Sequence, residues 1–376
     1  RNILAVTFTN KAAAQMRDRL RLALLKGIGE SSGAERERLK AQLAALPLAE
    51  ISTIHAFCGR LIRTYFYAAG VDPSFRIVGG EDAESAGLRT RALDDVFEQA
   101  YAAADPSFRL LLSVYYRKKK DTALRSLVVE LYQKARGLAG YEQILADMGA
   151  SDGFDEICSV LVSDLHTRAD MVIRGLEERG HIYAALGEKF TALADMVISV
   201  CRNIAAREDL FAMTGVLSEC AAMGRMPVKR SASDEERAAI GFLSGAKKET
   251  SGMLSEISSY ADRETEYARY RQANELAQAL GQLALAYDAA YAREKREAGV
   301  LDYNDLEQLA LRLLDNATVR SDLTARYHAV FVDEYQDVNP VQEAILSRLG
   351  SGEIFLVGDA KQAIYGFRGS RSECFE

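Results

Sequence analysis

The chain has 376 residues, of which 48% are apolar and 27% charged, and its formal net charge is −7. This length allows two domains, or one domain with a large insertion. The acidic balance excludes a protein that binds nucleic acid through a uniformly basic surface, so any such contact has to use local groups.

The five cysteines are scattered, and no two of them have the paired spacing of a metal site. This pattern predicts an intracellular, reduced chain whose cysteines bind no metal. No apolar run reaches transmembrane length and no signal peptide is visible, so we expect no membrane partner.

The first segment is predicted to be a buried strand followed by a helix. Ile3–Val6 is a short apolar run, and an amphipathic pattern begins at Lys11. Thr9 or Asn10 is expected to cap this helix, because short polar side chains accept hydrogen bonds from its first N–H groups. Residues 27–50, rich in glycine and serine at their start, predict a polar loop and then a short helix.

A second helix is predicted to open at 52–57, with an apolar face made of Phe57, Leu61, Ile62 and Phe66. A lone histidine at such a helix start is more often structural than chemical. From about residue 81 to 299 the chain is rich in Ala, Leu, Glu and Arg and nearly free of proline, which predicts consecutive amphipathic helices. No catalytic constellation is visible inside this stretch.

Two strand-like runs near the C-terminal end each finish in carboxylates. Ala329–Val332 leads into Asp333 and Glu334, and Ile354–Val357 leads into Gly358 and Asp359. Open α/β sheets bind their ligands at the carboxyl ends of parallel strands. Asp333 is therefore predicted to hold Mg²⁺, mostly through water, and Glu334 to polarise an attacking water.

A polar and aromatic loop follows the second of these strands. We expect Gln362 to contact a terminal phosphate, Tyr365 and Phe367 to stack on unpaired bases, and Arg368 to contact the nucleic-acid backbone. A single Asp-Glu pair after a strand is usually a solvated loop. Both strand ends and the loop together favour a nucleotide-driven motor.

These C-terminal segments carry a family resemblance. Residues 332–342 (VDEYQDVNPVQ) and 357–370 (VGDAKQAIYGFRGS) resemble motifs II and III of the UvrD/Rep-like superfamily 1A DNA helicases. At Lys361-Gln362 many relatives have Asp-Gln, and the lysine resembles the sequence of the RecB/AddA helicase-nuclease branch. The resemblance implies an ATP- and Mg²⁺-dependent translocase that moves 3′ to 5′ on single-stranded DNA.

Three further segments resemble elements of the same family. Residues 4–16 are similar to motif Ia, and 52–63 to its Thr-Phe-His-Ser-Phe motif, from which Ile54 departs. Residues 301–306 (LDYNDL) resemble the Leu-Asp-Phe-Asp-Asp-Leu element, which also predicts an Asp-capped helix. In the first part of the chain the implied DNA contacts are Thr7, Phe8, Asn10, Lys11, Thr53, His55 and Arg63.

The family implies a RecA-like P-loop NTPase parallel sheet of the α/β class, interrupted by a large all-helical inserted domain. On this basis 1–80 and 300–376 are parts of one motor domain, and 81–299 is the insertion. The implied partners are single-stranded DNA, single-strand/duplex junctions and a second helicase-nuclease subunit. The implied location is the bacterial cytoplasm, in association with the nucleoid. Repair or recombination, with an attached nuclease, is the expected setting.

The sequence contains no phosphate-binding Gly-x4-Gly-Lys-Ser/Thr loop. In the family this loop precedes motif Ia, so we expect it ahead of Arg1, with the arginines of a second motor domain after Glu376. Residues 1–376 alone are then expected to hydrolyse no ATP. Two alternatives stay open: an ATPase-inactive helicase-like DNA-binding module, which the intact Asp333, Glu334 and Gln362 disfavour, and an unrelated P-loop ATPase, which the aromatic loop disfavours.

Overall fold

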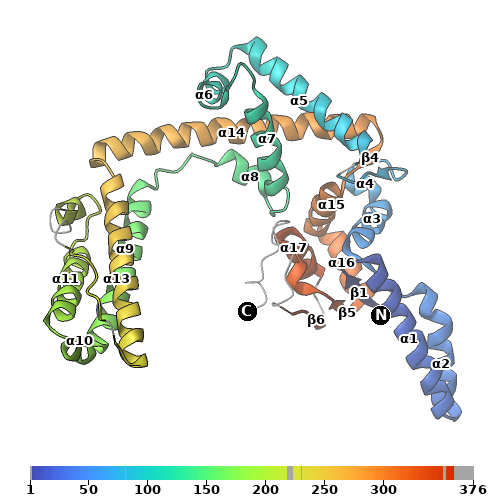
Figure 1. The fold of residues 1–376 in the computed structure, drawn as a ribbon. Helices are drawn as coiled ribbons and strands as arrows, with labels where there is room; N and C mark the ends of the chain where they lie inside the picture. The colour runs from blue at the N-terminus through green and yellow to red at the C-terminus, as the bar shows by residue number, and fades with distance from the viewer. Residues whose placement is uncertain (1, 81, 218–222, 230, 350–352, 360–376) are drawn as a thin grey trace. The chain divides into compact units, whose positions relative to one another are not determined.

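A computed structural model of the chain describes residues 2–80, 82–217, 223–229, 231–349 and 353–359 (Figure 1). The chain divides into two compact units, Arg1–Met148 with Leu276–Glu376, and Gly149–Glu275. Helices dominate both units, and a small parallel sheet lies in the first. The predicted α/β class with helical insertions is confirmed.

The main sheet is parallel and has the order β2-β1-β5-β6. Its central strands are β1 (Asn2–Thr7) and β5 (Tyr327–Val332), flanked by β2 (Glu50–Thr53) and β6 (Glu353–Leu356). The apolar runs of the sequence thus form β1, β5 and β6 within two residues of the predicted ends.

Helices cover the sheet on both faces. Leu4 and Val6 of β1 belong to the core that contains α3 (Ile54–Thr64), α15 (Tyr303–Asp315) and α17 (Pro340–Leu349). Successive side chains along a strand point to opposite faces of the sheet.

Ala5 accordingly packs on the opposite side of the sheet, in a small cluster with Ala13 of α1 (Asn10–Glu30) and Ile51 of β2. The chain crosses from β1 to β2 on this face of the sheet and from β5 to β6 on the other face. The two crossovers run in opposite directions along the sheet, and right-handed crossovers of opposite direction lie on opposite faces. The strand order therefore reverses between β1 and β5, where such sheets form a ligand crevice at their carboxyl ends.

The loop predicted at the start of 27–50 is wrong. The helix α1 continues through Gly27 and Gly29 to Glu30, and α2 (Gly33–Ala45) follows after a short turn. A Cβ at Gly27 would lie 3.2 Å from Leu39 Cδ1, so the missing side chain lets α1 and α2 pack closely. This packing outweighs the weak helix propensity of glycine.

The predicted apolar face of α3 is correct for Phe57, Leu61 and Ile62, which are all buried. It is wrong for Phe66, which is 41% exposed. The helix ends at Thr64, and Phe66 begins a separate short helix, α4 (Phe66–Ala69), so the 3.6-residue spacing no longer applies to it.

Two short parallel strands pair where the chain enters and leaves the helical stretch. Arg76 of β3 (Arg76–Ile77) lies opposite Val300 of β4 (Val300–Leu301). Between them the first unit holds α5 (Ala83–Ala103), α6 (Pro106–Tyr115), α7 (Thr122–Ala135) and α8 (Tyr141–Ala146). The second unit holds α9 (Phe154–Glu178), α10 (Gly180–Leu186), α11 (Glu188–Ala205) and α13 (Asp234–Ser259), and α14 (Arg263–Glu297) contributes to both units.

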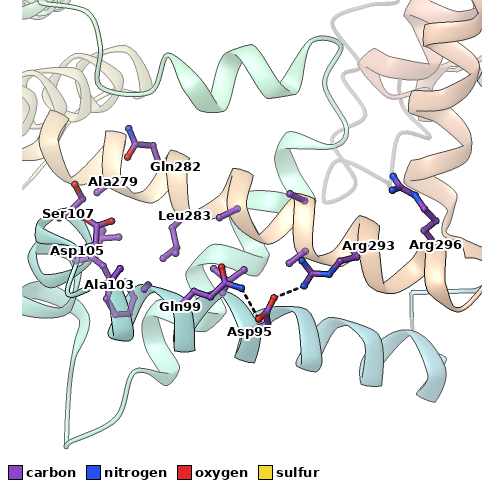
Figure 2. A pocket seen from close by; sticks show the side chains of 17 residues that line it. Asp95, Gln99, Ala103, Asp105, Ser107, Ala279, Gln282, Leu283, Arg293 and Arg296 are labelled. Atoms are coloured by element: carbon purple, nitrogen blue, oxygen red, sulfur yellow. Dashed lines mark hydrogen bonds and ion pairs between the residues drawn. The ribbon is translucent and has the colours of Figure 1, made fainter. Parts of the chain in front are cut away.

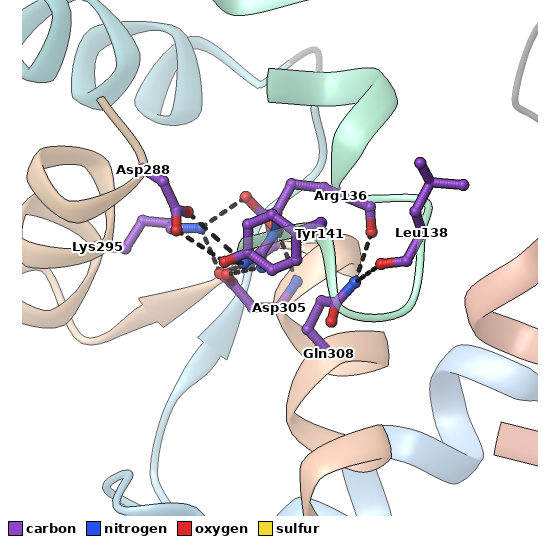
Figure 3. A network of polar contacts seen from close by, with 8 residues as sticks. Arg136, Leu138, Tyr141, Asp288, Lys295, Asp305 and Gln308 are labelled. Carbon is purple, nitrogen blue, oxygen red and sulfur yellow. Dashed lines mark hydrogen bonds and ion pairs between the residues drawn. The ribbon is translucent and has the colours of Figure 1, made fainter. Parts of the chain in front are cut away.

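A buried polar network fastens the end of α7 to α15 inside the first unit (Figure 3). Arg136 is 3% exposed, and its guanidinium donates to Asp305 Oδ1 at 2.7 Å and to the Tyr141 hydroxyl at 2.7 Å. Gln308, also on α15, donates to the carbonyl oxygens of Arg136 and Leu138 at 2.8 and 3.0 Å. Both helices are thus held by charge-assisted and backbone hydrogen bonds rather than by apolar contact alone.

Lys295 of α14 completes this network and is 2% exposed. Its ammonium group lies 2.6 Å from Asp305 Oδ2 and 2.9 Å from Asp302 Oδ2. Burial alone would lower the Lys295 pKa, but the Asp305 and Asp302 carboxylates outweigh it and raise that pKa. Asp302 also caps α15 in a reciprocal pair with Asp305, so the predicted Asp cap is confirmed.

Candidate functional site

The carboxyl ends of β1, β2 and β5 meet at one edge of the sheet. Val6 lies opposite Val332, and Thr7 lies opposite Thr53. The N–H of Asp333, the first residue after β5, donates to the Val6 carbonyl oxygen at 2.9 Å. The predicted acidic strand end and the predicted DNA-facing segment after β1 are therefore direct neighbours.

Asp333 is half-buried at this edge. Its Oδ1 accepts the backbone N–H of Glu334 at 3.1 Å, and among the described residues Oδ2 has no hydrogen-bonding partner. Mg²⁺ is commonly bound by one or two carboxylates together with water and substrate phosphates. A single half-buried carboxylate at the ligand edge of the sheet fits that role.

Glu334 has a backbone conformation that only glycine adopts readily. Its φ is 56° and its ψ is 44°, in the left-handed region. For a residue with a side chain such a conformation costs about 1–3 kcal/mol, and residues of this kind cluster at functional sites. Its carboxylate Oε2 accepts a hydrogen bond of 2.6 Å from Gln336 Nε2, which fixes the orientation of the group.

Gln336 joins the ends of β5 and β6 and was not predicted as a site residue from the sequence. It is 2% exposed, donates to Glu334, and accepts the backbone N–H of Asp359 on Oε1 at 3.0 Å. The neighbouring Tyr335 N–H donates to the Val357 carbonyl oxygen at 3.0 Å. The only signal for Gln336 was its place in the polar run that follows β5.

The segment after β1 presents a mixture of buried and exposed side chains. Thr7 is 1% exposed, and its hydroxyl donates to the Thr9 carbonyl oxygen at 3.0 Å. Thr9 caps α1 by accepting the Ala12 N–H at 3.1 Å, as expected. Phe8 is half-buried, whereas Asn10 and Lys11 are exposed in the first turn of α1. A helix N-terminus beside a lysine is suited to binding phosphate.

The segment after β2 places a histidine near the same edge. Thr53 is 9% exposed and caps α3, since its hydroxyl accepts the Ala56 N–H at 3.3 Å. The His55 side chain is 31% exposed, and its Nε2 lies 2.9 Å from Glu307 Oε1. The ring of Tyr303, 47% exposed, lies 4.7 Å from the His55 ring. Neither Tyr303 nor Glu307 was predicted as a site residue, because both contacts depend on how α3 packs against α15.

Arg63 does not lie with the others. It is in the last turn of α3, about 15 Å along the helix from Thr53 at a rise of 1.5 Å per residue. Its guanidinium lies over the Phe75 ring at 4.2 Å and donates to the Phe75 carbonyl oxygen at 3.3 Å. Arg63 is therefore separate from the edge where the other described candidates for DNA contact lie.

The predicted loop residues Gln362, Tyr365, Phe367 and Arg368 lie outside the described residues, so their roles stay predictions. Within the described ranges, no three His, Cys, Asp or Glu side chains gather as a metal cluster. The same ranges contain no helix that is both long and apolar enough to span a membrane.

A separate cavity of about 580 Å³ lies between α5, α6 and α14 (Figure 2). Alanine makes up much of the lining from α14. Asp95 and Arg293 also line the cavity and form an ion pair in which Oδ2 of Asp95 is 2.5 Å from Nη2 of Arg293. The cavity has no cluster of catalytic side chains. It is far in sequence from the strand ends, and we assign it no role in the site.

Comparison with known proteins gives one family over the whole chain. The sequence profile described as the UvrD/REP helicase N-terminal domain matches residues 1–376. The chain is similar to proteins named as the A subunit of an ATP-dependent helicase/nuclease. It is 34% identical to that of Pelotomaculum thermopropionicum and 32% identical to that of Bacillus licheniformis, with 97% of the chain aligned in each case. The corresponding protein of Clostridioides difficile is 28% identical over 99% of the chain.

The alignments cover 31%, 32% and 31% of these three relatives. The chain thus spans about a third of the length of the relatives it matches.

Proposed function

Because the chain belongs to the UvrD/REP helicase family, we propose that it forms part of the motor of an ATP-dependent DNA helicase. The observation that supports this most is the meeting of the acidic end of β5 with the segment after β1 at one sheet edge. The nucleotide and DNA contacts would then share one rigid edge of the sheet. A motor needs such a link if ATP turnover is to drive movement along DNA. The names of the relatives support an attached nuclease and a second subunit as partner. A role in DNA repair or recombination is proposed from the family resemblance alone.

The described residues divide the nucleotide chemistry between two carboxylates. Bound ATP would supply the free energy of phosphoryl transfer to water, with Mg²⁺ offsetting charge on its phosphates. Asp333 would hold that ion through water, and Glu334 would orient the attacking water. The strained backbone of Glu334 and its bond from Gln336 support hydrolysis over an inactive DNA-binding module, since both fix one carboxylate in a defined place.

Single-stranded DNA is proposed to lie along the ends of β1 and β2. Phe8 would stack on a base, Asn10 and Lys11 would contact the backbone at the start of α1, and His55 would contact the next nucleotides. Thr7 and Thr53 are buried, so their part is to shape the two turns through their hydroxyl bonds. We propose that the residues beyond the described range complete the nucleotide and DNA contacts, namely Gln362, Tyr365, Phe367 and Arg368.

We further propose that 81–299 is an insertion between two parts of one motor domain. The pairing of β3 with β4 supports this, because it joins the chain on both sides of that stretch. The helices inside the stretch also build their own apolar clusters, one around Phe97 and Tyr287 and another around Leu165 and Val197. Movement from 3′ to 5′ is proposed from the family alone.

A strand-displacement assay on duplexes with a 3′ or a 5′ single-stranded tail tests this function in the complete protein. ATP-dependent displacement is expected from the 3′-tailed duplex only. Phe8→Ala should weaken single-strand binding about 5- to 150-fold, since base stacking on an aromatic ring is worth about 1–3 kcal/mol.

Phe66→Ala is the matched control, because Phe66 is an exposed phenylalanine beyond the far end of α3. It should bind DNA like wild type. The proposal would be refuted if neither duplex were displaced, or if the Phe8 and Phe66 variants bound single-stranded DNA equally well.

A further inference from the structure

Glu307 is a buried carboxylate that binds three side chains at once. It lies on α15 and is 2% exposed. Its Oε1 lies 2.9 Å from His55 Nε2 and 2.6 Å from Gln342 Nε2, and its Oε2 accepts from Asn339 Nδ2 at 3.1 Å. A carboxylate oxygen accepts hydrogen bonds, so Nε2 of His55 is assigned as the donor to Glu307.

The three donors come from two functional segments. His55 follows the end of β2 and is partly exposed beside Tyr303, at the proposed DNA edge. Asn339 and Gln342 stand at the start of α17, where the Gln342 N–H donates to Asn339 Oδ1 at 2.8 Å. Glu307 therefore holds the first turn of α17 and the His55 imidazole in one arrangement.

The first turn of α17 is in turn connected to the loop that carries Glu334. Glu343 of this helix accepts the Tyr335 hydroxyl at 3.2 Å, and Tyr335 directly follows Glu334. The backbone of Glu334 lies in the left-handed region, which a residue with a side chain keeps only where the surrounding contacts hold it, so the contacts of Tyr335 bear on the position of this loop.

We propose that Glu307 is a positioning residue that couples the DNA contact of His55 to the loop that carries Glu334. A base that contacts His55 would move the imidazole ring relative to Glu307, and the carboxylate would pass that change to Asn339 and Gln342. This inference rests on the proposed function. It adds the internal route by which single-stranded DNA stimulates ATP turnover.

The test is steady-state ATP turnover by the complete protein, with and without single-stranded DNA. In Glu307→Gln an amide N–H₂ replaces one accepting oxygen, so at least one of the three hydrogen bonds is lost while the shape is kept. DNA stimulation should fall about tenfold, within the 5- to 150-fold range usual for coupled sites. The KM for ATP should stay within about twofold, because no contact with the nucleotide is changed.

Two variants of His55 keep the test independent of how well Glu307→Gln folds. His55→Ala should lose DNA stimulation, whereas His55→Gln keeps an N–H donor toward Glu307 and should retain most of it. The double variant His55→Ala/Glu307→Gln should be no worse than either single variant, because both remove the same link.

Asp315→Asn is the matched control. Asp315 is also on α15 and also bonds to α17, through Arg348 Nε at 2.8 Å, but its side chain is 58% exposed and lies at the other end of the helix. It should leave DNA stimulation unchanged.

Full stimulation in Glu307→Gln, equal losses in His55→Gln and His55→Ala, or multiplied losses in the double variant would each overturn the role of Glu307. A loss of the same size in Asp315→Asn would overturn it too, because any loosening of α15 from α17 would then suffice. A wild-type protein that hydrolyses ATP without responding to DNA would instead overturn the proposed function itself.

Discussion

Replacing Lys295 with methionine removes a buried cation from between two carboxylates. Lys295 is 2% exposed, and its ammonium group is 2.6 Å from Asp305 and 2.9 Å from Asp302. Asp305 keeps Arg136 at 2.7 Å, but Asp302 loses the cation that bonds to it. Breaking a buried ion pair in this way costs about 3–5 kcal/mol, because it leaves an uncompensated charge in the interior.

The pH dependence of this loss has a defined sign. In the wild type, burial would raise the Asp302 pKa, but Lys295 overrides it and lowers that pKa below its usual range. Asp302 therefore contributes stability above its unfolded pKa, and this is lost as pH falls through the folded pKa. In Lys295→Met no cation offsets the burial of Asp302, so its carboxylate takes up a proton more readily in the folded protein. Protonation removes the uncompensated charge. The difference in unfolding free energy between wild type and variant should therefore be smaller at pH 4.5 than at pH 7.

Scanning calorimetry of the complete protein at the two pH values measures both effects. At pH 7 the transition of the first unit should fall by roughly 10 °C, the shift expected for 3–5 kcal/mol in a unit of this size. Lys134→Met is the control, because Lys134 is 74% exposed and its ion pair with Glu130, at 2.8 Å, is screened by solvent and contributes little to stability. Equal shifts for the two variants, or a gap that widens in acid, would refute the reasoning.

Three smaller effects are also expected. Gly281→Ala should lower stability by about 1–3 kcal/mol in denaturant unfolding, because its Cβ would lie 2.2 Å from the Leu145 carbonyl oxygen; Gly245→Ala, with open space around it, should be neutral or stabilising. Burial raises the pKa of the Cys58 thiol well above its usual range, so iodoacetamide at pH 8 should label it only after unfolding, and fast labelling of the native protein would contradict this. Thr9→Ala should cost about 1 kcal/mol through the lost cap of α1, and an unchanged unfolding midpoint would count against that cap.

The sequence predicted the parts of the fold that depend on local pattern. The apolar run at 329–332 with carboxylates after it reads directly as β5 and its end, and Asp302 reads as a helix cap. The predictions of a loop at Gly27 and of a buried Phe66 were wrong for the same reason. Whether a glycine interrupts α1, or α3 continues past Thr64, is decided by packing against other elements rather than by local propensity.

The candidate site was predictable only where its residues share a strand end. Asp333 and Glu334 are adjacent in sequence, so their place at the edge follows from β5 alone. The bond between His55 and Glu307 joins residues 252 positions apart, and no periodicity reports it. Gln336 was missed for a related reason, because its bond to Asp359 depends on β5 and β6 being neighbours in the sheet.

ATP turnover by the Glu334→Gln variant of the complete protein is the most direct test of the proposed helicase motor. An amide cannot act as a base toward water, so turnover with single-stranded DNA should fall about 10²- to 10⁴-fold while ATP binding stays within a few-fold of wild type. Glu353→Gln, an exposed change at the start of β6 on the opposite edge of the sheet, should leave both unchanged. Turnover by Glu334→Gln at the wild-type rate would contradict the assignment of this carboxylate, and with it the proposed site.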